Sequence, residues 1–210
     1  MHMYVLATGI GAGFLIAAQV GPIWLLCFRN GVRFGFPSAI GIGLGAAFID
    51  TLYCILGALG AAVLLSAAST QRIISLIGAL VISWLGVRTI LAHRKSSATD
   101  SNEMNSRENK TFASAFRLSV AATASNPLTI ISWVALLSAA STYVKTTSGK
   151  INFAFGVGIG SLLFFTALSI AATYLGNRLS TIWIKRIDQA SAILFLFFAL
   201  ALLYRAATIS

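Results

Sequence analysis

The residue with the clearest chemical potential is Asp50, which lies in the apolar run GIGLGAAFIDTLY. We identify it as the only acidic residue within any stretch long enough to cross a membrane. An aspartate at the centre of a bilayer costs roughly 2.5–3.5 kcal/mol on insertion scales. We therefore expect Asp50 to face a cavity, a polar partner or a proton path. Tyr53 lies on the same helical face, where it either shares that environment or serves as an interfacial aromatic.

Two helix-breaking pairs are the second chemical feature, Gly21-Pro22 in QVGPIWLL and Asn126-Pro127 in ASNPLTII. Proline removes a backbone donor and disfavours helical geometry in the residue before it. A new half-helix then begins after each proline, and its partly positive N-terminal end suits a carboxylate. Either proline alone is equally well explained as a kink. Polar groups near the two breaks are Gln19, Thr123, Ser125 and Asn126. They either contribute to a substrate site or only hydrogen-bond to their own backbone.

Composition indicates an integral membrane protein. The chain of 210 residues is 58% hydrophobic, with a mean hydropathy of +0.88 and only 10% charged residues, against roughly 25% in soluble domains. A net charge of +10 suggests nucleic acid in a soluble protein. Here the basic residues lie between apolar runs, as in cytoplasmic loops, so we expect a lipid bilayer and no nucleic acid as partner.

Nothing in the sequence indicates enzyme chemistry. Cys27 and Cys54 lie in apolar runs without a CxxC pattern or neighbouring histidines, so neither a metal site nor a disulfide framework is indicated. No phosphate-binding loop, metal cluster or nucleophile triad is found. We expect a protein that is not an enzyme and needs no cofactor.

Six apolar runs are long enough to be spans, given that a bilayer core needs about 20 residues per helix. They cover about 4–28, 37–67, 72–92, 112–140, 151–176 and 187–206. The third and sixth reach full length only if Arg88 and Arg205 extend to the interface. The predicted fold is an all-α integral membrane protein with six transmembrane helices, arranged as two inverted three-helix repeats.

A polar loop at 93–111, including HRKSSATDSNEMNSRENK, divides the chain into a first repeat at 1–92 and a second at 112–210. Alternate loops carry unequal positive charge, with only Arg72, Lys145, Lys150 and Arg205 of the 15 basic residues on one side. The positive-inside rule therefore places the 93–111 loop in the cytoplasm and both termini outside. Failure of one weak span would change this topology.

An internal repeat supports the division. Aligning Pro22 with Pro127 also brings GIGLG at 41–45 near GVGIG at 156–160, with an insertion near 141–150. Three helices per half make successive repeats enter the membrane in opposite directions, as in secondary transporters with a midplane site. The glycines favour close helix packing and allow a homodimer, although Gly-rich motifs also recur by chance.

These segments resemble the LysE/RhtB family of amino-acid exporters. The likeness is carried by GPIWLLCFRNGVRFGF and GIGLGAAFIDTLY in the first half. In the second half it is carried by ATASNPLTIISWVALLSA, GVGIGSLLFF and, more loosely, IDQASAILFLFFALAL. The resemblance implies a bacterial inner-membrane exporter of amino acids or closely related small metabolites.

We expect proton-coupled antiport by alternating access. The half-helix ends after Pro22 and Pro127 would hold the substrate carboxylate, and Asp50 would pair with the amino group or exchange a proton. One alternative is a channel with Asp50 as a pore charge. Another is a six-helix thiol-redox carrier, which would need one cysteine in each half, whereas Cys27 and Cys54 both lie in the first.

Overall fold

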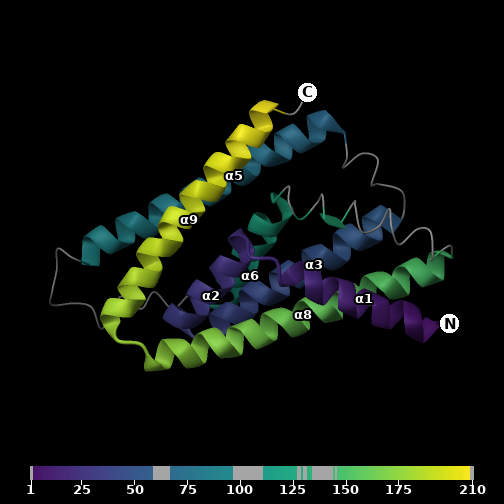
Figure 1. Cartoon of the computed structure of the whole chain (residues 1–210), viewed down its shortest axis with the longest axis horizontal. Helices are drawn as coiled ribbons and strands as arrows, with labels where there is room; N and C mark the ends of the chain where they lie inside the picture. Colours follow the sequence, from purple (N-terminus) through teal and green to yellow (C-terminus); the bar gives the residue numbers. More distant parts are fainter. Residues whose placement is uncertain are drawn as a thin grey trace.

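Apolar helices make up almost all of the computed structural model, which describes residues 2–58, 67–96, 111–126, 129, 132–133, 144 and 146–208. Within these residues the regular secondary structure is all α-helical (Figure 1). The helices are α1 (His2–Ala17), α2 (Pro22–Phe34), α3 (Phe36–Ala58), α5 (Ala68–Ser96), α6 (Phe112–Ala124), α8 (Thr147–Arg178) and α9 (Thr181–Thr208).

Four of the described helices are long and apolar enough to cross a membrane, namely α3, α5, α8 and α9. The bent pair α1 and α2 makes a fifth if it counts as one span. Of the predicted fourth run, α6 forms a short apolar helix, and much of the chain between α6 and α8 lies outside the described residues. The all-α membrane fold is confirmed, while the six-span inverted repeat stays a prediction.

The helix break expected at Gly21-Pro22 is present. Helix α1 ends at Ala17, α2 begins at Pro22, and the two axes differ by 77°. Proline is well suited to the first turn of a helix, where its missing N–H would have no partner. A second sharp turn comes after α2 at Gly35, whose φ of 81° is one that residues with a Cβ rarely adopt.

Helix α8 is the centre of the main helical layer, in which it packs against α1, α2 and α3. Glycine makes these contacts close. A Cβ on Gly160 would overlap the backbone carbonyl of Ile10, and a Cβ on Gly41 would lie 2.7 Å from that of Phe112. All six glycines of GIGLG and GVGIG contact other helices of the same chain, and Gly158 does so through the Thr51 side chain of α3. The packing role is confirmed, and the homodimer is untested.

Helices α5 and α9 run side by side as a separate pair (Figure 1). At one end of the pair, Arg72 Nε donates to the carbonyl of Ala206 at 3.0 Å, and Arg205 donates to Gln71 at 3.1 Å. Helix α9 also contacts α2, and α5 touches α6. The pair is therefore joined to the main layer chiefly through α2 and α6.

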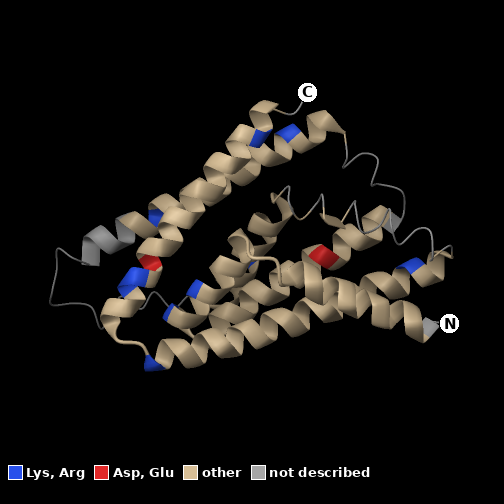
Figure 2. Cartoon of the chain, viewed as in Figure 1, with Lys and Arg blue, Asp and Glu red and all other residues tan. Residues whose placement is uncertain are grey.

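Several helix boundaries differ from the sequence prediction. Helix α5 continues to Ser96, into the segment assigned to the polar loop. Helix α9 begins at Thr181, earlier than the predicted 187, and it contains Asp188, which already lay at the edge of the predicted run. The prediction that Asp50 is the only acidic residue within a span is therefore wrong. Figure 2 shows one acidic position on α3 and another on α9.

Candidate functional site

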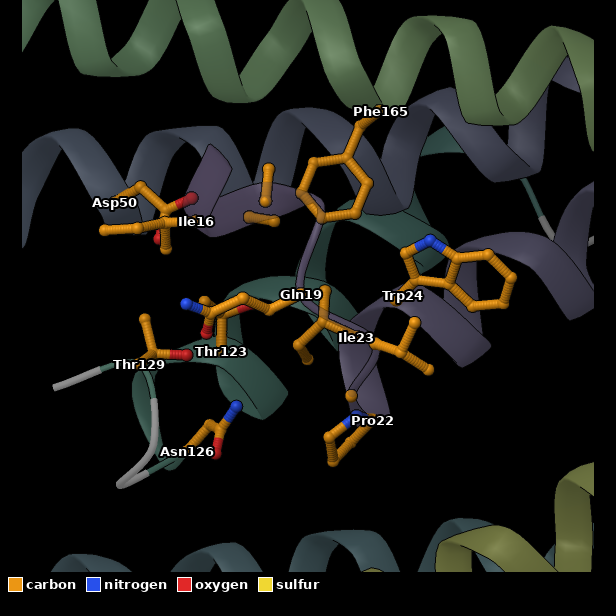
Figure 3. A pocket seen from close by; sticks show the side chains of 14 residues that line it. Ile16, Gln19, Pro22, Ile23, Trp24, Asp50, Thr123, Asn126, Thr129 and Phe165 are labelled. Carbon is orange, nitrogen blue, oxygen red and sulfur yellow. The ribbon is translucent and has the colours of Figure 1, made fainter. Parts of the chain in front are cut away.

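A cavity of about 80 Å³ lies at the break between α1 and α2 (Figure 3). The end of α1, the start of α2, the middle of α3 and the end of α6 meet there, together with Phe165 from α8. A water molecule needs about 10–15 Å³ of such space, so the cavity is large enough for a small polar group. The lining includes six predicted site residues: Gln19, Gly21, Pro22, Asp50, Thr123 and Asn126.

Asp50 lies in the wall of this cavity with only 4% of its surface exposed. Its Oδ1 accepts a hydrogen bond from the indole Nε1 of Trp133 at 3.0 Å, and its Oδ2 accepts one from the hydroxyl of Ser161 at 2.7 Å. Hydrogen bonds to the charged form compensate for the loss of water around a buried carboxylate. Each oxygen keeps further acceptor capacity for a ligand or proton.

Thr123 places a buried hydroxyl group in the cavity lining. It is 2% exposed, lines the cavity, and its hydroxyl has no hydrogen-bond partner within the part of the chain that the structure describes. A buried hydroxyl without a partner carries a free-energy cost. In Figure 3 the amide of Gln19 points toward Thr123 and Thr129. These side chains form a polar part of the cavity lining, where a ligand could hydrogen-bond to the Thr123 hydroxyl.

Two predicted site residues, Tyr53 and Ser125, are not in the cavity lining. The buried Tyr53 directs its hydroxyl to α6, where it donates to the carbonyl of Ala124 at 2.6 Å. The hydroxyl of Ser125 donates to the carbonyl of Ala121 in the last turn of the same helix. Pro127 lies outside the described residues, so the predicted second half-helix start has no described geometry.

Sequence reasoning missed the residues that hold Asp50. Trp133 and Ser161 lie 83 and 111 positions away along the chain, and no spacing rule connects them to it. One signal was available for Ser161, because it comes directly after GVGIG, the segment matched with the GIGLG that precedes Asp50. Phe165 was missed for the same reason, since it reaches the cavity only through packing of α8 on α3.

A second cavity of about 300 Å³ adjoins the first and shares Pro22 and Asn126 with it. Its other wall is the C-terminal half of α9, from Phe198 to Thr208. The cavity therefore lies between part of α9 and the helix ends around the break.

Asp188 is the second buried acid, with 3% of its surface exposed. Its carboxylate accepts from Arg29 Nε at 2.8 Å and forms an ion pair with Arg33. Within the described residues it is the only acid other than Asp50. Both arginines were expected in the loop after the first apolar run, whereas they lie on α2.

Comparison with known proteins places these features in a family context. The family model for LysE type translocators matches residues 14–206. The chain is 29% identical over 182 residues to "Putative amino acid efflux protein YcgF" of Bacillus subtilis, covering 84% of each protein. It is 26% identical over 176 residues to "Chemotactic transduction protein ChpE" of Pseudomonas aeruginosa, covering 81% of this chain and 83% of that protein. No solved structure matches.

Proposed function

The chain belongs to the LysE type translocators, and from that premise we propose that it exports amino acids or closely related small metabolites. Membership and the apolar helices indicate a multi-pass transporter of the inner membrane rather than an enzyme. The name of the Bacillus subtilis relative supports amino acids as the substrate class. The observation that carries the proposal is a buried aspartate in the wall of a cavity at a helix break.

The cavity offers complementary partners for the two charges of an amino acid. The first N–H groups of α2 after Pro22 have no partner within their helix, and together with the helix dipole they favour a carboxylate. Asp50 supplies a negative charge for an ammonium group. Gln19, Thr123 and Asn126 add hydrogen-bonding groups in the same lining. In this scheme the matching half-helix after Pro127 would complete the carboxylate site.

Proton coupling gives Asp50 a second role in the proposal. A buried carboxylate held by Trp133 and Ser161 binds the substrate ammonium when charged. Once protonated it loses that attraction and releases the substrate. Exchange of one proton for one substrate molecule would then drive antiport.

Reciprocal glycine contacts support an inverted repeat and alternating access. Gly41 and Gly45 of α3 pack against α6, the first helix of the second half. Gly156 and Gly160 of α8 pack against α1, the first helix of the first half. Between the two segments, Gly43 meets Phe165 of α8 and Gly158 meets Thr51 of α3. Two halves related by approximate twofold symmetry would produce this pattern, and such repeats rock about a central site.

The thiol-redox alternative loses support from the cysteines. Both are free and fully buried, and they belong to different apolar clusters. Cys27 contacts Ser169 and the carbonyl of Ala39. A carrier of thiol chemistry would need a reactive, accessible cysteine in each half.

The proposal is tested by Asp50→Asn in cells that express the protein and are loaded with dipeptides, with amino acids measured in the medium. We expect wild-type cells to accumulate one or a few amino acids outside and the variant to lose this export while reaching the membrane normally. Wild-type export rates in the variant would remove Asp50 from the mechanism. No amino acid released by wild-type cells would contradict the substrate class, and linear, non-saturating flux would favour a channel.

A further inference from the structure

The second buried charge cluster lies away from the cavity at the helix break. Arg29 and Arg33 are one turn apart on α2, and both reach Asp188 near the start of α9. Each arginine pairs with a different carboxylate oxygen. Arg29 and Asp188 are 6% and 3% exposed, whereas the side chain of Arg33 is 30% exposed. Arg29 and Asp188 are thus shielded from solvent, whereas solvent reaches the cluster at Arg33.

These three residues join two parts of the molecule. Contact between α2 and α9 is a main connection from the α5–α9 pair to the central layer. Toward the other end of α9, from Phe198 to Thr208, a cavity of about 300 Å³ lies between this helix and the residues Pro22 and Asn126. The two parts are therefore joined by an ion-pair cluster at the Asp188 end, and beyond it a cavity adjoins α9 beside the apolar contacts that continue between them. Figure 2 shows the acidic position on α9 close to basic positions.

We propose that Arg29, Arg33 and Asp188 form a latch that closes one end of the transport pathway between α2 and α9 and that opens during each transport cycle. The inference rests on the proposed transport function. It adds a moving element that neither the family match nor the relatives' names assign.

The physical basis is that the ion-pair cluster is stable in two states, paired or fully hydrated, and is unstable in intermediate ones. A buried ion pair is acceptable when fully paired, and separated charges are acceptable when hydrated, but a buried charge without a partner is costly. Partial separation of α2 and α9 would leave the buried charges of Arg29 and Asp188 unpaired and without water. The cluster therefore favours either a closed, paired state or an open, hydrated one, which is the behaviour required of a gate.

Asp188 is the more sensitive member of the latch. It is the single acid that faces the two arginines in the described residues. Neutralising it would leave two like charges one helical turn apart, and their repulsion would favour hydration and opening. By the positive-inside prediction the latch is at the cytoplasmic end, because Arg29 and Arg33 belong to the more basic side of the chain.

A single-cysteine reporter tests the latch without any transported substrate. Ile23 lines the cavity at the helix break and is 7% exposed, so Ile23→Cys places a smaller thiol there. A charged, membrane-impermeant thiol reagent is applied to intact spheroplasts and, separately, to inside-out vesicles. Cys27 and Cys54 are 0% exposed, and labelling of the chain without the reporter measures their contribution.

With the latch intact, we expect the reporter to react mainly from the outside. Asp188→Asn should raise labelling from the cytoplasmic side on the order of tenfold. Asp188→Glu keeps the carboxylate between the two arginines and should keep labelling near the wild-type pattern. Arg186→Gln is the matched control, because Arg186 is an exposed residue of α9 that stacks on Trp183, and it should change nothing.

Unchanged sidedness of labelling in Asp188→Asn, with the protein at its normal level in the membrane, would overturn the latch. If that variant does not reach the membrane, Arg33→Gln removes only the partly exposed partner, and unchanged labelling there overturns it equally. Because no substrate is involved, failure of amino-acid export leaves this result standing. A result that overturns the latch likewise leaves the proposed role of Asp50 unaffected.

Discussion

At the scale of single residues, the candidate site depends on how the two carboxylate oxygens of Asp50 are held. Trp133 and Ser161 donate to one oxygen each from different parts of the second half. Together they keep the carboxylate in a fixed orientation beside the cavity. The site is therefore defined by its supporting donors as much as by the acid itself.

Ser161→Ala tests this support. Hydrogen bonds to charged groups contribute about 1.5–3 kcal/mol, so we expect the apparent KM for export to rise about tenfold or more. Ser169→Ala is the control: it removes another fully buried serine hydroxyl from α8, one that donates to the Phe165 carbonyl. Export kinetics of the two variants at matched membrane levels make the comparison. Equal KM values would show that the Ser161 hydroxyl does not support the site.

Thr123→Val tests the hydroxyl without a partner. Valine has nearly the same shape, and removing an unsatisfied buried group does not destabilise a fold. We expect unchanged or slightly higher thermal stability in detergent, together with a raised KM for export. Thr89→Val, whose parent hydroxyl donates to the Leu85 carbonyl within α5, should leave KM unchanged. A normal KM in Thr123→Val would place this hydroxyl outside the substrate site.

At the scale of helices, glycine decides how closely the central layer packs. Gly156 and Gly160 on α8 face Gly9, Ile10 and neighbouring backbone atoms on α1. Close approach of two backbones maximises dispersion contacts where the hydrophobic effect cannot drive helix association. The glycine segments noticed in the sequence are therefore structural, and they fix the position of the helix that carries Ser161.

Gly160→Ala measures this packing. The added Cβ would overlap the backbone carbonyl of Ile10, and forcing extra volume into a packed interface costs about 1–3 kcal/mol. We expect a lower midpoint of thermal unfolding in detergent and less protein in the membrane. Gly11→Ala adds the same methyl to α1, where nothing lies within 4 Å, and should be neutral. Similar behaviour of the two variants would contradict the packing argument.

The α1–α2 break shows what a local sequence signal can predict. Gly21-Pro22 is sufficient to stop one helix and start another, because the constraint is in the covalent structure of proline. The 77° angle between the two helices is not a local property. Helix α1 packs near Gly156 and Gly160 of α8, whereas α2 packs near Ala172 and Gly176, so the angle depends on contacts with a helix distant in sequence.

At the scale of the whole molecule, the number of spans decides where the chain ends lie. The described helices provide at most five spans, which would put the two ends on opposite sides. A sixth span within 112–140 would put both ends outside, as the basic residues predict. Reporter fusions at each end distinguish the two: we expect alkaline phosphatase to be active and green fluorescent protein to be dark at both. Fluorescence at one end only would indicate five spans.

The sequence by itself determined the membrane fold, the helix break, the glycine packing segments and Asp50 as the central acid. Each of these depends on local physical chemistry: apolar length, the missing proline N–H, the absence of a Cβ, and the cost of charge in lipid. Only the tertiary structure decided which residues meet. Trp133 and Ser161 reach Asp50, Tyr53 turns to Ala124 instead, and Asp188 joins Arg29 and Arg33. These are contacts between helices distant in sequence, and their partners are set by the packing of the whole chain rather than by any short segment.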